Sequence, residues 1–516
     1  MIVLVLSFWA VRPLFHSGFF PVHDDTQVAR VQQMTQALAD GQFPVRWVAD
    51  LGYGFGYPIF NFYAPLAYYV GTLFTFLGFT ALAATKIMIA LGIVLAGIFM
   101  YFLAREFWGQ TGGVIAGLFY VYAPYHAVDI YVRGTVGELW AMAFLPLVFF
   151  GLWRIFQKEK TGVIIGGLGF AAVILSHNLT ALMVLPFILP FMIRYPRFAF
   201  LALGLSAFYW LPALAEMNLT KVLGQIGGGA DFRDHFVYWD QLWASPWGFG
   251  GSAPGRLDGM SFMVGKLHFL VIFISLFLVT RKKLLIFPLI AFGLAVFLTT
   301  QSSELIWKAI PPLAFVQYPW RFLVLAVFAA SFAAGGIATA FKKFTLPVSG
   351  VLLFTLLILN TKYFQPQSFN GLTSAEYTAE EKIKWETSRI SDEYLPKDFP
   401  TPTSRDDVAW EKLAILSGQA SLNHLNLRSH QYNFDLSAQT PTEVLINVAY
   451  FPGWKVWVNG NETDPAIVDG KIRLSFVPGD YQVVLKFTNT SIRTLANLIS
   501  LISILVLLKY TCGQRD

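Results

Sequence analysis

The chain has 516 residues, of which 55% are hydrophobic and 13% are charged, whereas soluble globular proteins carry about 25% charged residues. This composition, with a mean hydropathy of +0.55, excludes a water-soluble cytoplasmic enzyme. The only cysteine, Cys512, excludes a secreted domain held by disulfides, and despite a net charge of +6 no basic run interleaved with aromatics indicates nucleic-acid binding.

The charged residues concentrate in 362–490, and the rest of the chain is a succession of apolar stretches. We therefore expect a membrane body over 1–361, a polar domain over 362–490, and a last transmembrane helix with its tail over 491–516. A transmembrane helix needs about 20 apolar residues. By that criterion the chain has about twelve spans, at roughly 2–19, 82–104, 112–126, 138–156, 161–177, 179–193, 198–215, 262–279, 284–300, 320–340, 344–361 and 492–508.

The basic residues predict the orientation, because Lys and Arg in short loops stay in the cytoplasm. Six breaks carry them, and with twelve spans all six lie on one side of the membrane. Both termini are then cytoplasmic and the polar domain is extracytoplasmic. The breaks contain Arg105; Arg154, Lys158 and Lys160; Arg194 and Arg197; Arg281, Lys282 and Lys283; Lys342 and Lys343; Lys509 and Arg515.

The apolar stretch 65–79 would reverse this pattern if it crossed the membrane. We interpret it as a re-entrant or interface helix packed on the body, with a short thirteenth span as the alternative. At the N-terminus, Met1 begins in apolar sequence and no basic residue precedes Arg12. This favours an uncleaved first span over a signal peptide.

In the first outer loop, 20–64, His23, Asp24 and Asp25 precede a helical pattern. An aspartate at a helix N-terminus accepts backbone N–H bonds and suits the helix dipole, so capping is one interpretation. One carboxylate satisfies that need, and two adjacent carboxylates repel each other. A catalytic role is therefore the second interpretation.

The run 52–66 in the same loop is rich in glycine, proline and aromatic residues. No strand precedes it and no Lys-Ser/Thr pair follows, so the run does not indicate a nucleotide loop. The composition suits a loop that lies on the lipid headgroups. It also suits a platform for a sugar ring or a polyprenyl tail, and His23, Tyr57 and Tyr63 are the candidate residues for that role.

Five further charged or titratable residues lie near the outer membrane edge, where charge is costly and indicates function. Asp129 and Arg133 have the spacing of a local i,i+4 ion pair, and Glu138 has no obvious local partner. His177 begins an outer turn, where a polar cap is the simpler interpretation. Arg321 opens the tenth span, where it either snorkels to the interface or makes a forked contact with a lipid phosphate.

The outer loop 216–261 carries Asp231, Asp234, His235 and Asp240, for which a metal site and solvated loop charge are the two interpretations. In the polar domain, Thr378 and Glu381 have the spacing of a capping box ahead of a helix at 382–386. A proline-rich linker follows.

Alternating apolar residues after Leu422, with turns at Asn459-Gly460 and Pro478-Gly479, then predict a small antiparallel β-sandwich. This domain contains no catalytic constellation that the sequence reveals. We interpret it as a binding or covering module.

Several short motifs resemble the 6-pyruvoyl-tetrahydropterin-synthase-related family of bacterial membrane proteins. The strand 450–454 resembles the C-terminal domain of polytopic proteins tied to glycosylation, and the wider architecture resembles the GT-C superfamily of membrane glycosyltransferases. No three-histidine zinc site accompanies the family name. The motifs are Val22-His23-Asp24-Asp25; Gly54, Gly56 and Pro58 with Tyr63, Pro65 and Leu66; Ser176-His177-Asn178; and Tyr318-Pro319-Trp320-Arg321-Phe322.

The GT-C resemblance implies an acid in the first outer loop, Asp24 or Asp25, and a second acid, Asp129 or Glu138. It implies a polyprenyl-phosphate sugar donor and a glycan, lipid or protein acceptor at the outer leaflet of a bacterial-type plasma membrane.

One hypothesis is therefore a glycosyltransferase whose first-loop aspartate is the general base. Arg321, Arg133 and His177 would bind the donor phosphate. A divalent cation, Mg²⁺ or Mn²⁺, is compatible with this chemistry but not required by it. The other hypothesis is a non-catalytic protein that binds, flips or assembles lipid-linked glycans.

Overall fold

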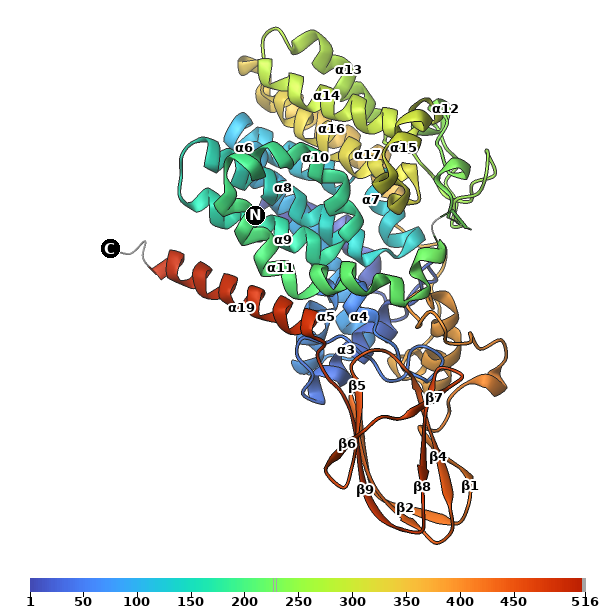
Figure 1. Cartoon of the computed structure of the whole chain (residues 1–516). Helices are drawn as coiled ribbons and strands as arrows, with labels where there is room; N and C mark the ends of the chain where they lie inside the picture. The colour runs from blue at the N-terminus through green and yellow to red at the C-terminus, as the bar shows by residue number, and fades with distance from the viewer. Residues whose placement is uncertain (226, 229, 513–516) are drawn as a thin grey trace.

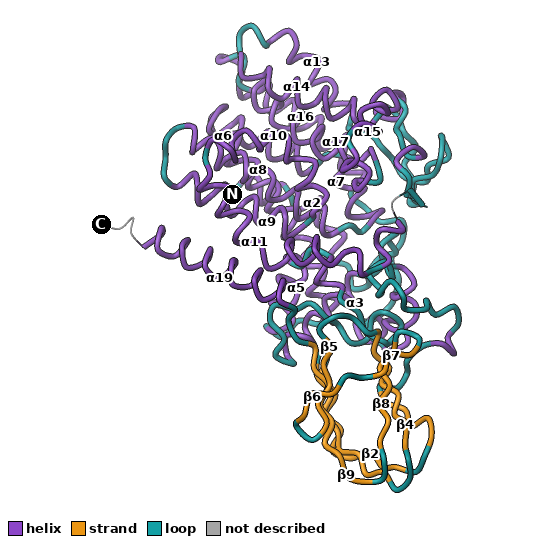
Figure 2. Tube along the Cα trace, in the orientation of Figure 1, coloured by secondary structure: helices purple, strands orange, loops and turns teal. Residues whose placement is uncertain are grey.

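A body of helices forms one end of the molecule and a lobe of strands forms the other (Figure 1). The computed structural model describes residues 1–512 except 226 and 229, so the tail 513–516 with Arg515 lies outside the described residues. Loops concentrate where body and lobe meet (Figure 2). The prediction of a mostly helical chain with several apolar helices and with antiparallel β-structure near the C-terminus is confirmed.

The described residues form nineteen α-helices, and the longest of them follow the apolar stretches of the sequence. Their bounds are α1 Ile2–Leu6, α2 Phe8–Val11, α3 Gln27–Ala39, α4 Ile59–Phe62, α5 Leu66–Phe76, α6 Ala81–Val121, α7 Pro124–Val128, α8 Val136–Phe156, α9 Thr161–Ser176, α10 Asn178–Arg194, α11 Pro196–Glu216, α12 Trp239–Trp243, α13 Lys266–Leu278, α14 Ile286–Thr299, α15 Glu304–Ala309, α16 Leu323–Ala338, α17 Thr345–Asn360, α18 Ser374–Tyr377 and α19 Ser491–Cys512.

Six helices in the described part of the chain are long and apolar enough to cross a membrane, or seven if the bent pair Lys283–Thr299 and Gln301–Ala309 is one span. The predicted count of about twelve is not confirmed. Helices α9, α10 and α13 have only 16, 17 and 13 residues. The first predicted span, 2–19, is broken at Ser7 into α1 and α2.

Helix α6 folds back on itself at Gly109, where φ is +72°. Its two arms touch at Gly97 and Gly117, and a Cβ placed on Gly117 would lie 2.7 Å from the carbonyl oxygen of Gly97. Small residues permit such close approach of helix backbones. The arms coincide with the predicted spans 82–104 and 112–126, which together count as one helix among the six.

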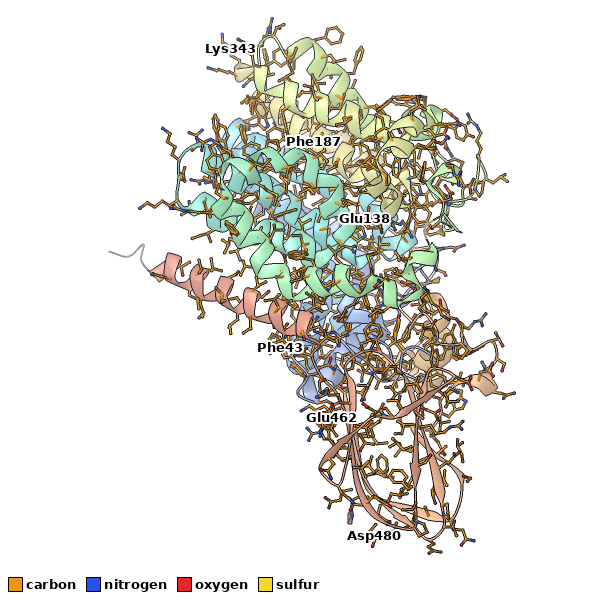
Figure 3. All side chains as sticks on the ribbon, viewed as in Figure 1. Phe43, Glu138, Phe187, Lys343, Glu462 and Asp480 are labelled. Atoms are coloured by element: carbon orange, nitrogen blue, oxygen red, sulfur yellow. The ribbon has the colours of Figure 1, made fainter. Side chains whose placement is uncertain are left out.

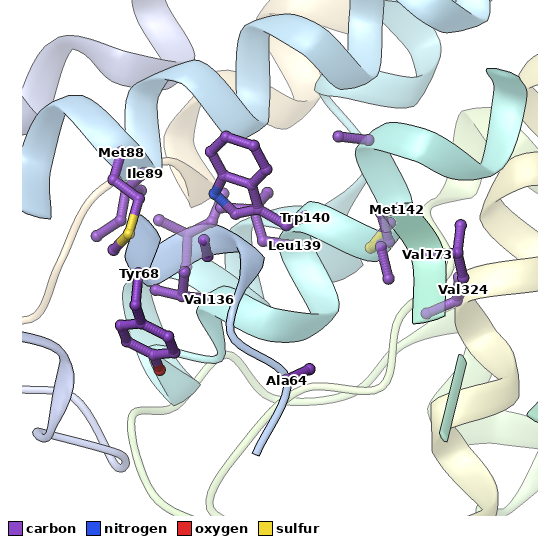
Figure 4. Close-up of a cluster of buried hydrophobic side chains, with 14 of the residues drawn as sticks. Ala64, Tyr68, Met88, Ile89, Val136, Leu139, Trp140, Met142, Val173 and Val324 are labelled. Atoms are coloured by element: carbon purple, nitrogen blue, oxygen red, sulfur yellow. The ribbon is translucent and has the colours of Figure 1, made fainter. Parts of the chain in front are cut away.

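The apolar stretch after residue 65 forms α5, whose 11 residues are too few to cross a membrane. Gly71 in α5 meets Val31 of α3 and Met88 of α6. Tyr68 of α5 belongs to the same buried cluster as Met88 and the α8 residue Trp140 (Figure 4). The short helix is thus packed on the body, and its length does not support the alternative of a thirteenth span.

The lobe is a sandwich of a four-stranded sheet, β1-β4-β8-β7, and a five-stranded sheet, β2-β3-β9-β5-β6, with antiparallel pairing throughout. Asn459 and Gly460 have φ of 50° and 81°, the backbone of a tight hairpin turn between β5 and β6. The strands are β1 Leu413–Ser417, β2 Ala420–Arg428, β3 Gln431–Ala438, β4 Thr442–Ala449, β5 Trp454–Val458, β6 Asn461–Thr463, β7 Ala466–Val468, β8 Lys471–Phe476 and β9 Gly479–Phe487.

The capping box predicted at Thr378 and Glu381 is wrong. Thr373 and Glu376 form the box, at the start of α18, and the Thr378 hydroxyl instead donates to the carbonyl of Ser374. Both pairs have the same spacing, so the local pattern cannot distinguish them. Residues Lys382–Thr387 form a π-helical turn without a side-chain cap.

A buried polar network joins the last helix to the body and the first loop. Glu216, at the end of α11, accepts hydrogen bonds from Arg493 Nε at 3.0 Å, Asn61 Nδ2 at 2.8 Å and Thr490 Oγ1 at 2.8 Å. Arg46 donates to Asn61 Oδ1 at 2.9 Å. Since buried charges need partners, this network fixes where the chain leaves the lobe and enters α19.

Candidate functional site

One cavity of about 460 Å³ lies where the first loop, the helical body and the segment after the π-helical turn meet. This size lies within the range of about 300–1,000 Å³ found for small-molecule sites. Glu138, on its wall, lies inside the helical body in Figure 3, far from Lys343 at one end and Asp480 at the other. Seven of the ten predicted site residues line the cavity: His23, Asp24, Tyr63, Arg133, Glu138, His177 and Arg321.

Asp24 is placed in the cavity by backbone pairing and does not cap α3. Its N–H donates to the carbonyl of Arg133 at 2.8 Å, and the N–H of His23 donates to that of Val132 at 3.0 Å. Helix α3 begins after Thr26 without a side-chain cap, so the capping interpretation is wrong. The Asp24 side chain is 39% exposed and lies 2.9 Å from His23 Nδ1.

The surroundings of Asp24 favour its charged form. Burial acts to raise the pKa of Asp24, but the hydrogen bond with His23 and the positive charges of Arg133 and Arg30 outweigh it, and the pKa is lowered. The same hydrogen bond raises the pKa of His23 against the opposing effect of burial. A carboxylate and a histidine that share a hydrogen bond therefore face the cavity.

Asp25 faces away from the cavity. Its carboxylate lies 3.7 Å from Lys382 Nζ, and the residue does not line the cavity wall. Burial raises the pKa of Asp25, with Lys382 partly opposing the rise. The two adjacent aspartates are thus separated into different environments.

Arg133 is the centre of a buried charged cluster beside the cavity. It forms the predicted ion pair with Asp129, and its Nη1 also lies 2.9 Å from Glu138 Oε2. Tyr125 donates to Glu138 Oε1 at 2.7 Å. The expectation that Glu138 has no local partner is therefore wrong. Asp129 is fully buried and does not line the cavity, so Glu138 is the acid of this cluster that does.

A π-helical turn, Asp129–Arg133, creates this geometry. Gly134 follows it with φ of +73°, and a Cβ there would lie 2.6 Å from Val22 Cγ2. Glycine therefore lets the chain turn into α8 against the first loop. The turn directs Arg133 toward Glu138 five residues later.

Arg321 is a second guanidinium on the cavity wall. Its Nη1 donates to the Val316 carbonyl at 2.7 Å and to Gln317 Oε1 at 3.3 Å, and it stacks 4.9 Å from the ring of Tyr318. In the described residues it has no carboxylate within 4.0 Å, and its Nε has no hydrogen-bond partner. Because this guanidinium lines the cavity, it is able to bind an anion there.

His177 both caps a helix and lines the cavity. Its Nδ1 accepts from the Thr180 N–H at 3.3 Å at the start of α10 and lies 2.8 Å from Thr180 Oγ1. The predicted polar cap is confirmed. The rest of the ring remains on the wall next to Glu138 and Arg321.

The glycine-aromatic run of the first loop docks the polar domain instead of lying on lipid. Tyr53 and Phe55 are buried, and their carbonyls accept from the N–H groups of Ala409 and Ala449, each at 3.0 Å. A Cβ on Gly54 would lie 2.4 Å from the Ala409 carbonyl oxygen. Only a glycine permits this approach, so the headgroup interpretation of the run is wrong.

The two predicted platform tyrosines occupy different places. Tyr57 is fully buried, does not line the cavity, and donates to the carbonyl of Ser391 at 2.7 Å. It therefore holds the chain behind the wall and does not offer a platform. Tyr63 lines the cavity and packs against Arg30, whose guanidinium carbon lies 4.2 Å from the ring centre.

Among the cavity residues that the sequence did not predict are Arg30, Ser391, Asp392, Glu393 and Tyr394. Arg30 lies on α3, and the other four directly follow the π-helical turn of the polar domain. No local pattern marks them, because their role depends on the docking of two segments some 360 residues apart. The polar domain, which we interpreted as a binding or covering module, thus contributes acids to the cavity.

The loop 216–261 shows paired charge. Asp231 pairs with Arg233, Asp240 pairs with Arg256, and His235 Nδ1 lies 2.9 Å from Ser252 Oγ. Over residues 1–512, leaving out 226 and 229, no three His, Cys, Asp or Glu side chains are grouped to hold a metal ion. Mg²⁺ or Mn²⁺ stays a prediction, and no described cluster provides its site.

Comparison with known proteins bears on the body side of this cavity. Residues 60–223 match the family model described as "6-pyruvoyl-tetrahydropterin synthase related domain; membrane protein". The predicted family resemblance is confirmed over this range. The matched domain contains Tyr63, Arg133, Glu138 and His177. An uncharacterized protein of Lactococcus lactis subsp. cremoris (strain MG1363) is 25% identical over 242 residues, which cover 42% of this chain and 39% of that protein.

Among solved structures, the chain is similar to the Archaeoglobus fulgidus oligosaccharyltransferase. The apo form has a TM-score of 0.46 and 13% identity over 79% of this chain and 60% of that one. The form tethered to an acceptor peptide with the NVT sequon has a TM-score of 0.45 and 15% identity over 78% and 59%. The chain thus spans about two fifths of the curated relative and three fifths of these structures.

Proposed function

We propose that this protein is a membrane glycosyltransferase. It moves a sugar from a polyprenyl-phosphate donor to an acceptor hydroxyl at the extracytoplasmic face, with Asp24 as general base. The observation that supports this most is one cavity lined by both Asp24, whose charged form is favoured, and Arg321, which has no carboxylate partner in the described residues. Sugar transfer from a lipid phosphate needs a base that accepts the proton of the acceptor hydroxyl and a group that binds the phosphate.

In the proposed reaction, Asp24 accepts the proton of the acceptor hydroxyl while that oxygen forms a bond to the anomeric carbon of the donor. The bond between the anomeric carbon and the phosphate oxygen breaks, and polyprenyl phosphate leaves with the electron pair. Attack opposite the leaving group inverts the anomeric configuration. His23, hydrogen-bonded to Asp24 Oδ1, orients the carboxylate.

The leaving phosphate is bound by Arg321. Arg133 is already paired with Asp129 and Glu138. It therefore acts on the phosphate mainly through its positive charge and not as a free hydrogen-bond donor. In the part of the chain that the structure describes, Arg321 Nε has no hydrogen-bond partner, and the Val316 carbonyl holds the guanidinium through Nη1. A preorganised guanidinium stabilises the charge that develops on the leaving oxygen without reorganisation.

The test is transfer of a radiolabelled hexose from its polyprenyl phosphate in proteoliposomes. Asp24→Asn should lower turnover by about 10²–10⁴-fold, the usual contribution of a general base. Asp25→Asn is the matched control, since this neighbouring carboxylate contacts Lys382 outside the cavity; we expect it to keep wild-type turnover. Undiminished transfer by Asp24→Asn would refute the mechanism. Donor binding without any transfer by the wild type would favour the non-catalytic alternative.

A further inference from the structure

The cavity has a second charged end, built by α3 and the polar domain. Arg30 Nη2 donates to Ser391 Oγ at 2.7 Å, and Ser391 Oγ in turn donates to the Glu393 carboxylate at 3.0 Å. Arg30 is 3% exposed, its Nε has no hydrogen-bond partner in the described residues, and it lines the cavity. This relay holds the Glu393 carboxylate, which also lines the cavity, in one place.

Aromatic residues of the first loop fix this segment from behind and beside it. Tyr53 donates to Asp392 Oδ2 at 3.0 Å. The ring of Tyr394 stacks on Phe62 with centroids 5.8 Å apart and 4° between planes, and it meets Tyr63 edge to face at 6.4 Å. The second end of the cavity therefore has carboxylates and half-buried aromatic rings on a rigid support.

Asp24 lines the same cavity as Arg30 and Arg321. The positive charges of both Arg133 and Arg30 act to lower its pKa against the effect of burial. A base in that position is able to receive a proton from a molecule seated at the Arg30 end. The sugar phosphate would lie at the other end.

We propose that the wall formed by Glu393, Asp392, Tyr394 and Tyr63 is the acceptor subsite, and that the acceptor is a carbohydrate. This inference rests on the proposed function. A sugar ring offers neighbouring hydroxyl donors to the acceptor-only carboxylates, and its C–H face packs on aromatic rings. A hydrocarbon chain would cover Glu393 and Asp392 and leave the acceptor sites not used by Ser391 and Tyr53 without hydrogen bonds, which is costly.

The first measurement is direct binding, which needs no turnover. Saturation-transfer NMR on the wild-type protein in nanodiscs uses methyl pyranosides of glucose, galactose, mannose and N-acetylglucosamine. At least one should receive saturation from the protein, and Glu393→Gln should weaken its binding about tenfold or more, as expected for loss of a hydrogen bond to a charged group. Glu381→Gln, an exposed acid paired with Arg405 outside the cavity, is the matched control.

The second measurement separates acceptor from donor. In the transfer assay, Glu393→Gln should raise the KM for the saccharide acceptor at least tenfold and leave the donor KM and slow donor hydrolysis by water unchanged. Thermal unfolding of the variant, which changes one oxygen to nitrogen, verifies that it is folded. An unchanged acceptor KM would overturn the subsite while leaving Asp24-dependent transfer intact.

The two proposals fail in different ways. If the wild type never transfers sugar but a pyranoside binds in a Glu393-dependent manner, the transferase proposal falls and the carbohydrate site stands. If no pyranoside binds the wild type, or if sugar is transferred to a Ser/Thr peptide and to none of the saccharides, the carbohydrate acceptor is refuted.

Discussion

Replacing Glu216 by alanine should destabilise the whole molecule, because this carboxylate is the shared acceptor of the network that holds α19. Its two oxygens accept from Arg493, Asn61 and Thr490 at 2.8–3.0 Å. Arg493 is fully buried, so the substitution leaves its guanidinium without a carboxylate partner. Removing one partner of a buried ion pair costs about 3–5 kcal/mol of the free energy of unfolding.

The exposed ion pair Glu304–Lys308 provides the control. Its nitrogen and oxygen are 2.6 Å apart, closer than in the buried pair, but its side chains are 31% and 55% exposed. Solvent screening reduces such a pair to about 0–1 kcal/mol. Glu304→Ala should therefore have a small effect, although its geometry is the better of the two.

The assay is equilibrium unfolding by sodium dodecyl sulfate in mixed micelles, followed by tryptophan fluorescence. A Glu216→Leu/Arg493→Leu double variant should recover part of the loss, because it buries no lone charge, with a coupling of about 0.5–3 kcal/mol. The reasoning is refuted if Glu216→Ala costs no more than Glu304→Ala. It is also refuted if the losses of Glu216→Leu and Arg493→Leu, each measured singly, add up to the loss of the double variant.

Three further predictions concern the cavity and the body. Arg321→Gln should lower transfer by about 10²–10³-fold with little change in acceptor KM, measured by steady-state kinetics. Gly117→Leu should abolish the folded, monodisperse protein in size-exclusion chromatography, because its Cβ would lie 2.7 Å from the Gly97 carbonyl oxygen. Burial raises the pKa of Glu393 above its ordinary 4.5 against the opposing charge of Arg30, so acceptor KM should rise as the pH falls through that raised value. Glu393→Gln should remove this pH dependence of the acceptor KM. Because folding favours protonated Glu393, the same variant should also raise the thermal stability at neutral pH.

The sequence was informative where physical properties are local. Apolar length located most of the long helices, alternation located β4, β5 and β9, and i,i+4 spacing predicted the Asp129–Arg133 pair. The predicted site residues His23, Asp24 and Arg321 line one cavity, whereas Asp25 does not. These features depend on neighbours in the sequence or on the common membrane edge to which the loops return.

The sequence was uninformative where the outcome depends on distant segments. Which of Asp24 and Asp25 faces the cavity is decided by backbone pairing of His23 and Asp24 with Val132 and Arg133. A π-helical turn brings Arg133 to Glu138, and no residue pattern in the sequence predicted that turn.

The glycine-aromatic run was compatible with lipid, sugar or protein contact. The buried carbonyls of Tyr53 and Phe55 identify the partner as the polar domain.

The position of Glu393 explains why the polar domain and the first loop must dock for the cavity to exist. Its wall is held by Tyr57, which bonds the Ser391 carbonyl, and by Arg30, which bonds the Ser391 hydroxyl. Both come from the first loop and its helix, and the same loop carries Asp24. A displacement of the lobe would therefore separate the proposed base from the proposed acceptor wall while leaving Arg321 in the body. Donor binding should survive such a displacement, and transfer should not.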